Sequence, residues 1–165
     1  QYAESISLYN DLTGHGFKER TDNVNTAKQV SVASEEIKKL IAENNILDQQ
    51  LYDFSCHLLK QRLAVTKTGG DWVYGLIDHL DESSVSGIAY VKGGVDAVDI
   101  DIYQGEILLA KIATTIYRPG YIQFGAPRNG FVGFSYHFDK ETEPSSIRVL
   151  VASTGQELTK KLVSL

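Results

Sequence analysis

The spacing of apolar residues along the chain changes once, near residue 64. Before that point apolar side chains recur every three or four residues, as in Leu47, Leu51, Phe54 and Leu58, which is the period of one helix face. From Trp72 onward they recur at every second position, which is the period of one face of a strand. The pattern predicts an α+β chain, with an N-terminal helical segment followed by an antiparallel β-sandwich.

Three helices are expected in the first part of the chain. The first covers residues 1–13 and ends at Gly14-His15-Gly16. The second begins after Ser34, because a serine hydroxyl accepts hydrogen bonds from the free backbone N–H groups of a first turn. Asn44-Asn45 suits its end, since asparagine tolerates the left-handed conformation common there. Asp48 is placed to cap the third helix.

The second and third helices each carry an apolar stripe. Ile37, Leu40 and Ile41 share one face of the second helix, and the third has the four-residue stripe given above. We expect the two helices to pack on each other and on a further surface. A stripe left exposed would indicate a missing partner, because monomers seldom keep a contiguous apolar patch in water.

Seven or eight short strands are expected after residue 70. Val98, Ile100 and Ile102 alternate with polar residues, as in a strand with one buried and one wet face. Gln104-Gly105 has the composition of a hairpin turn. Turn signals that recur roughly every 8–12 residues are typical of a sandwich, here of about 95 residues. The predicted strands cover residues 72–77, 85–91, 98–103, 107–116, 131–138, 147–152 and 157–162. The predicted domains are residues 1–64 (helical tail), 65–70 (linker) and 71–165 (sandwich).

Composition narrows the classes of partner. The chain is 42% hydrophobic and 22% charged, with a net charge of −5, and neither half contains a basic stripe. We therefore expect no nucleic-acid or anionic-membrane partner. No apolar run approaches the roughly 20 residues that span a bilayer. The single cysteine, Cys56, has no internal disulfide partner, fits a small buried hydrophobe, and favours a cytoplasmic location.

The helical part resembles the carboxyl-terminal end of the P-loop sulfotransferase family, in the branch that includes heparan-type and bacterial enzymes. The resemblance covers about 60 residues, roughly a third of the chain. It is carried by Glu4-Ser5, by Thr21-Asp22-Asn23-Val24-Asn25, and above all by Glu43-Asn44-Asn45, Asp48 and Leu51-Tyr52-Asp53-Phe54. It implies a parent transferase that moves a sulfuryl group from 3′-phosphoadenylyl sulfate to a hydroxyl or amine.

The chemistry implied by this resemblance needs parts that the chain lacks. A glycine-rich loop and a lysine would hold the phosphosulfate of the donor, and a base would take the proton of the acceptor. No G-x-x-x-x-G-K-[ST] pattern is present. We therefore assign no catalytic and no cofactor-binding residue, and expect the chain itself to be inactive. With Gln1 in place of Met, we expect a fragment that lies after a catalytic domain.

The β part resembles a small domain appended to bacterial glycosyltransferases and sulfotransferases. The matching residues are Gly75-Leu76-Ile77-Asp78, Ser86-Gly87-Ile88-Ala89, Tyr117-Arg118-Pro119 and Asn129-Gly130-Phe131. The resemblance implies a fold and attachment to such an enzyme, but it implies no reaction for the domain itself.

Metal and hydrolytic sites are not predicted. The four histidines, His15, His57, His79 and His137, form no pair with zinc-ligand spacing. Asp99 and Asp101 share one face of a strand, where their oxygens could bind a calcium ion. Alternatively, they keep that face of the sheet hydrated and protect the sheet edge from aggregation. A paired-carboxylate site would need two acids facing each other across a cleft, which sequence does not show.

Aromatic residues are the better functional lead, because flat rings can pack on sugar rings while polar groups bind the hydroxyls. They also fill the cores of sandwiches. Our candidates for a glycan-binding face are Tyr103, Tyr121 and Arg128. Arg118, before a proline, is expected to fix a corner by bonding carbonyl groups.

The sequence thus favours a non-catalytic C-terminal fragment of a carbohydrate-modifying, sulfotransferase-like enzyme. Its sandwich would serve acceptor binding or subunit contact, with a glycan acceptor and an upstream catalytic domain or partner chain as partners. The alternative is a free-standing binding or structural module with no link to a transferase.

Overall fold

The computed structural model describes residues 2–20 and 33–160, and its contacts divide the chain into two units, Gln1–Ala64 and Val65–Leu165. The expected turn at Thr21-Asp22-Asn23, the family motif that continues to Asn25, and the end of the last predicted strand lie outside the described residues.

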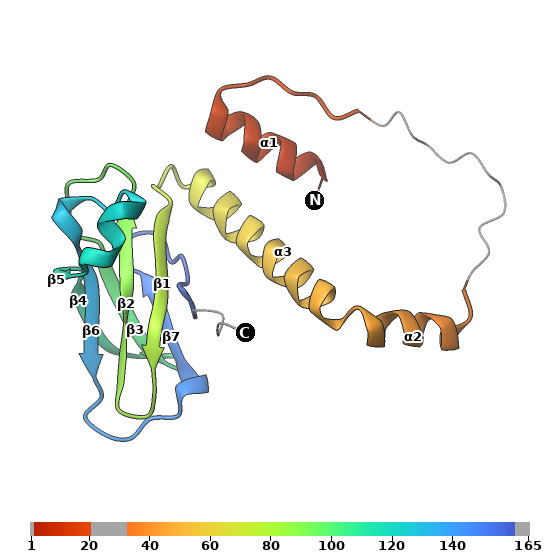
Figure 1. Ribbon diagram of the computed structural model, residues 1–165. Coiled ribbons are helices and arrows are strands. Elements are labelled where there is room, and N and C mark those ends of the chain that lie inside the picture. Colours follow the sequence, from red (N-terminus) through yellow and green to blue (C-terminus); the bar gives the residue numbers. More distant parts are fainter. Residues whose placement is uncertain (1, 21–32, 161–165) are drawn as a thin grey trace. The chain divides into compact units, whose positions relative to one another are not determined.

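The first unit consists of helices, as expected (Figure 1). Helix α1 covers Tyr2–Thr13, α2 covers Glu35–Asn44, and α3 starts at Ile46 and ends at Lys67. The predicted cap is confirmed, because the Ser34 hydroxyl accepts a hydrogen bond from the Ile37 N–H at 3.3 Å. Gly14, with φ +70°, follows α1 in the left-handed conformation, so it stops the helix without strain.

Two expected helix ends are wrong in detail. Asn45 has φ −123° and ψ 30°, outside the left-handed region, and its N–H bonds the Ala42 carbonyl at 3.3 Å. Asp48 lies inside the first turn of α3 and is not its cap; its charge there still faces the positive end of the helix dipole. Helix α3 continues three residues into the predicted linker, 65–70.

The expected burial of the two helical stripes is also wrong for the described residues. Helix α2 buries no side chain, and α3 buries Val65 alone. Leu47 and Leu51 are 72% and 62% exposed. Helical periodicity predicted the helices correctly, but it does not say what covers their apolar faces.

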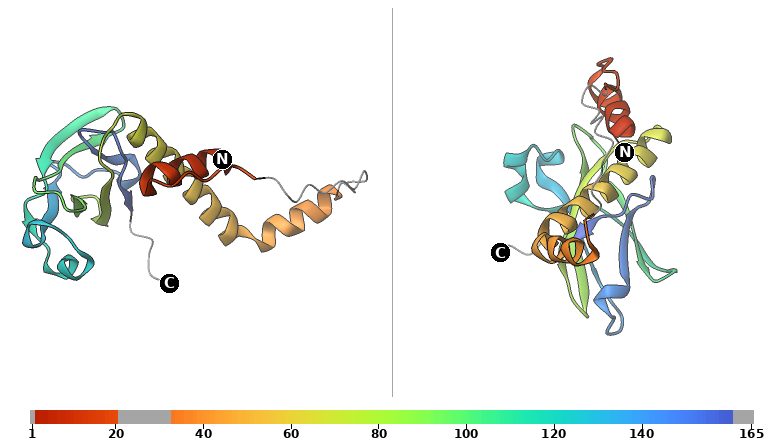
Figure 2. Two further views of the ribbon diagram at one scale, coloured as in Figure 1. Left: turned by 90° about the horizontal axis from the view of Figure 1, so that it is seen from above. Right: turned by 90° about the vertical axis from the view of Figure 1, so that its right-hand side faces the viewer.

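The second unit is a two-layer β-sandwich, and Figures 1 and 2 show its sheets from three directions. One sheet has five strands in the order β5-β6-β2-β1-β8, and the other has three in the order β4-β3-β7. The strands are β1 (Val73–Leu80), β2 (Ser84–Val91), β3 (Asp99–Gln104), β4 (Ile107–Ala113), β5 (Ile116–Tyr117), β6 (Phe131–His137), β7 (Ile147–Val151) and β8 (Thr159–Lys160).

The core lies between the two sheets. Ile100 and Ile102 of β3 are fully buried, while the intervening Asp101 faces outward and pairs with Lys111 of β4 at 3.3 Å. Phe134 of β6 and Val149 of β7 meet in the same cluster. The alternation predicted for β3 is therefore confirmed, and burial of its apolar side chains favours folding by roughly 1.5–3 kcal/mol each.

One pairing departs from an all-antiparallel arrangement. Strand β8 joins the edge of the five-stranded sheet parallel to β1, with Leu76 opposite Thr159. All other strand pairs in the described residues are antiparallel.

Candidate functional site

Two tyrosines lie side by side on the outer face of the five-stranded sheet. Tyr74 of β1 and Tyr90 of β2 are register partners, and their rings stack with centroids 5.9 Å apart and planes 21° apart. Their neighbours Val73 and Ala89 point the other way, into the core. Side-chain alternation along both strands therefore places the two rings outward as a pair.

Tyr121 joins this pair from a 3-10 segment, Pro119–Phe124, between β5 and β6. Burial raises the pKa of Tyr90, and the neighbouring phenols of Tyr74 and Tyr121 raise it further. The Tyr90 hydroxyl therefore stays neutral at physiological pH and can both donate and accept a hydrogen bond. We call Tyr74, Tyr90 and Tyr121 the tyrosine face.

The loop that holds Tyr121 is fixed by glycines. Gly125 ends the 3-10 segment in the left-handed conformation, with φ +79°. Gly130 has φ +87°, and a Cβ there would lie 3.0 Å from a carbon of Ile122. Beyond Tyr121 the loop exposes Phe124, which is 70% accessible, with the two ring centroids 6.4 Å apart. The tyrosine face thus has an apolar rim.

A polar cluster occupies the same outer face four residues further along the two strands, beyond the Leu76–Ile88 pair. The Ser86 hydroxyl donates to Asp78 Oδ1 at 2.9 Å, and Arg118 Nη1 lies 3.8 Å from Asp78 Oδ2. Gly133 makes room for the arginine, because a Cβ there would lie 2.7 Å from Arg118 Cγ. Arg118 Nε is buried without a hydrogen-bond partner among the described residues. The cluster offers a carboxylate, a hydroxyl and a guanidinium on the sheet face that also carries the aromatic rings.

The structure separates the three residues predicted for a glycan face. Tyr103 is on β3 of the three-stranded sheet, opposite Leu108 and Arg148. Tyr121 and Arg128 lie in the β5–β6 connection of the other sheet, in neighbouring 3-10 segments. The tyrosine face therefore contains one of the three, Tyr121.

Arg128 takes the structural role that was expected of Arg118. Its Nη1 donates to the Thr114 carbonyl at 2.8 Å. Thr114 is fully buried, and its hydroxyl accepts from the Val98 N–H at 2.9 Å. Arg128 therefore fixes the loop to Thr114, directly after β4. Arg118, by contrast, extends toward Asp78 of β1.

Sequence reasoning did not single out Tyr74, Tyr90 or the Arg118–Asp78 pair. A usable signal was present for the tyrosines, since the two lie at equal distances on either side of the β1–β2 turn near Glu82. Residues so placed face each other across a hairpin. The loop that brings in Tyr121 and Arg118 leaves no comparable signal.

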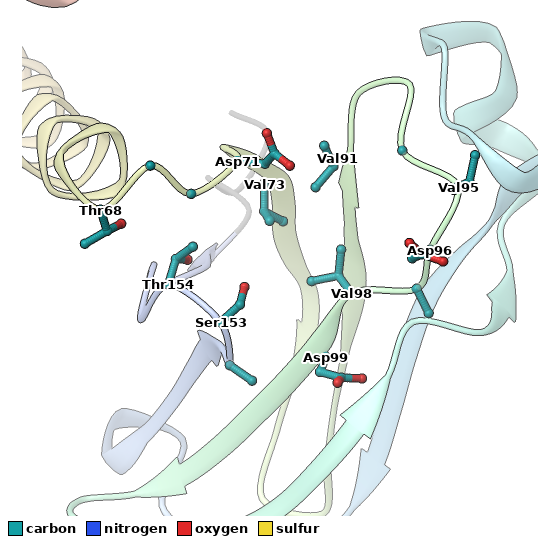
Figure 3. A pocket seen from close by; sticks show the side chains of 15 residues that line it. Thr68, Asp71, Val73, Val91, Val95, Asp96, Val98, Asp99, Ser153 and Thr154 are labelled. Carbon is teal, nitrogen blue, oxygen red and sulfur yellow. The ribbon is translucent and has the colours of Figure 1, made fainter.

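A separate hollow of about 670 Å³ opens at one end of the sandwich (Figure 3). It is formed by residues 68–71 after α3, by residues 94–99 before and at the start of β3, and by residues 152–154 after β7. Figure 3 shows the carboxylates of Asp71, Asp96 and Asp99 spread around the hollow, without convergence on one point. Among the described residues no group of three His, Cys, Asp or Glu side chains is placed to hold a metal ion.

The hollow does not fit the phosphosulfate donor of a sulfotransferase. Gly69 and Gly70 follow the carboxyl end of α3, where the helix dipole is negative, whereas anion cradles use the opposite end. None of the described residues that line the hollow is Lys, Arg or His. Three acids and a negative helix end would repel a phosphosulfate.

Cys56 is half-exposed on α3 and so is not the buried hydrophobe expected. It lies one helical turn after Tyr52, and its hydrogen bond with the phenol raises the pKa of Tyr52. Within the described residues, no helix has both the length and the apolar character needed to cross a bilayer.

Comparison of the chain with protein-family models, curated proteins and solved structures gives no match in any of the three. Its function is therefore inferred from the chemistry of its own residues.

Proposed function

We propose that the sandwich, Val65–Leu165, is a non-catalytic carbohydrate-binding module whose tyrosine face receives a sugar ring. The observation that carries this proposal is the gathering of Tyr74, Tyr90 and Tyr121, with the Arg118–Asp78 pair further along the same sheet face. Within the resemblance stated above, the module would present a glycan acceptor to a sulfotransferase-like parent that uses 3′-phosphoadenylyl sulfate.

The chemistry of this face suits a sugar. The axial C–H groups of a pyranose form a flat apolar surface that packs on an aromatic ring, and its hydroxyl groups need both donors and acceptors nearby. The tyrosines supply rings and hydroxyls, Asp78 supplies acceptors, and Arg118 supplies donors. A shallow open face of this kind binds an exposed chain of sugars more readily than a small molecule that needs enclosure.

We propose that the chain binds its ligand without catalysing a reaction. The donor-binding loop of the parent enzyme is absent from its sequence, and the acidic hollow is unsuited to the donor. Incubation of the chain with labelled donor and mixed glycans should give no sulfated product; turnover would refute this part of the proposal. The lone cysteine supports a cytoplasmic location for the chain.

A glycan array probed with the full chain tests the proposal. Binding should fall roughly tenfold for Tyr74→Ala and for Tyr121→Ala, since each removes one aromatic contact surface. Tyr103→Ala is the matched control, because it removes the same side chain from the other sheet. Equal losses in all three variants, or no binding by the unchanged chain, would count against a sugar site here.

A second candidate function is protein docking by the same region. It is favoured by exposed apolar side chains next to the tyrosine face, namely Ile116, Tyr117, Ile122, Phe124 and Phe131. A protein interface would depend on this rim, whereas sugar binding would depend on the tyrosines. Phe124→Ser therefore separates the two: it should leave glycan binding nearly unchanged and weaken a protein contact.

A further inference from the structure

The apolar stripes of α2 and α3 follow one spacing in the sequence, which we call the seam, and the non-helical residue Asn45 divides it into two helical parts. Counted from Ile37, the positions on this seam alternate at spacings of three and four residues without interruption through both helices. They are Ile37, Leu40, Asn44, Leu47, Leu51, Phe54, Leu58, Gln61 and Val65. This is the heptad spacing of a two-stranded coiled coil, and single polar residues within it are typical of seams that select one register.

Most of this seam has no partner within the described part of the chain. Leu40 and Leu47 are exposed, as is Leu51, and Phe54 and Leu58 are half-buried. Val65, by contrast, is 3% exposed and belongs to the sandwich unit. The free part of the seam therefore ends before Val65. Its four apolar residues within α3, from Leu47 to Leu58, are centred between Leu51 and Phe54.

The charges beside the seam are divided along its length. Residues 35–53 contain five acidic side chains and two lysines, a net charge of −3. Residues 54–67 contain Lys60, Arg62 and Lys67 and no acid, a net charge of +3. A second copy lying antiparallel would bring each acidic half against a basic half, whereas a parallel copy would bring like charges together.

We propose that α3 pairs with α3 of a second copy of the chain in an antiparallel coiled coil. Its central register places Leu51 opposite Phe54 of the second copy and Leu47 opposite Leu58. Helix α3 alone supplies these four layers, so the turn at Asn45 does not interrupt them.

One ion pair follows from this register and distinguishes it from a parallel one. Asp48 and Arg62 occupy flanking positions next to the seam, and in the antiparallel register they meet across the two copies. In a parallel pair Asp48 would instead lie beside Glu43 of the other copy, and Arg62 beside His57. Reversal of the charge at residue 48 therefore has opposite effects in the two orientations.

Analytical ultracentrifugation of the full chain over a concentration series tests the pairing. The unchanged chain should sediment as a reversible dimer. Asp48→Arg and Arg62→Asp should each raise the dissociation constant roughly tenfold, and the double variant should recover most of the loss. Tighter association of Asp48→Arg would show a parallel pair. A monomer at every concentration would overturn the proposal and leave the seam to a different protein.

Disulfide cross-linking gives a second readout that does not depend on affinity. In a Cys56→Ser background, Leu47→Cys mixed with Leu58→Cys should give a cross-linked heterodimer, and neither variant alone should cross-link efficiently. Efficient self-cross-linking of each variant would overturn the antiparallel register. Unchanged Trp72 fluorescence would show that the sandwich remains folded in these variants.

Discussion

The side chain of Gln156 makes the two backbone hydrogen bonds with Val73 that a neighbouring strand would otherwise make. Its Oε1 accepts from the Val73 N–H at 3.0 Å, and its Nε2 donates to the Val73 carbonyl at 2.7 Å. Both residues are buried. The two bonds connect the first strand of the sandwich to a turn 83 residues later, and they satisfy backbone groups at the point where β1 begins.

Gln156→Ala should lower the free energy of unfolding of the sandwich by about 3 kcal/mol, because both backbone groups of Val73 would lose their partners while buried. Urea unfolding followed by the fluorescence of Trp72, the one tryptophan of the chain, measures this loss. The matched control is Gln123→Ala, which removes an exposed bond to the Gly120 carbonyl and should cost less than about 0.5 kcal/mol. Similar losses in the two variants would contradict this role for Gln156.

Gly87→Ala should destabilise the sandwich by more than about 3 kcal/mol. A Cβ at residue 87 would lie 2.2 Å from the Leu76 carbonyl oxygen and 2.7 Å from the Phe134 ring, so the two strands would have to separate. Gly120→Ala is the control, since nothing lies within 4 Å of its added Cβ. The same urea experiment compares them, and a mild effect at residue 87 would show that the β1–β2 pairing adjusts easily.

Asp81 should give the sandwich a specific sensitivity to acid. Its Oδ1 accepts from the hydroxyl and the backbone N–H of Ser83 and from the Ser84 N–H. These bonds, the Ser83 hydroxyl first, hold the pKa of Asp81 well below its usual value, with a further contribution from His79. Because the folded pKa is lowered, the stabilisation is complete above the unfolded value of about 3.9 and declines as the pH falls below it.

The comparison of the unchanged chain with Asp81→Asn tests this sensitivity. The difference between their urea midpoints should be constant from about pH 5 to 7 and should shrink progressively below about pH 4. A difference that persists unchanged in acid would mean that the Asp81 charge does not contribute.

The sandwich was largely predictable because its strands alternate cleanly. Ile100 and Ile102 alternate with polar residues in the sequence, which predicts a strand with one buried face. In the structure both side chains are completely buried. The parallel attachment of β8 was not predictable, since it depends on where a short strand can pair after a turn. Burial of the α2 and α3 stripes was predicted wrongly for the described residues, because an apolar face does not reveal whether its partner is in the same chain.

The tyrosine face, too, was predictable only in part. Tyr121 was a candidate from its loop, but Tyr103 was grouped with it although the two belong to different sheets. Sheet membership is set by long-range pairing, which local patterns do not encode. Tyr74 and Tyr90 become a pair only through the register of β1 with β2.

The most direct test of the proposed function is an NMR titration of the ¹⁵N-labelled chain with the glycan that binds best on the array. The measured quantity is the change in chemical shift of each backbone amide. The account predicts that the largest shifts occur at Tyr74, Tyr90 and Tyr121 and that the β3–β4 hairpin with Tyr103 is unaffected. Shifts confined to the three-stranded sheet or to the acidic hollow, or no shifts with any glycan, would contradict it.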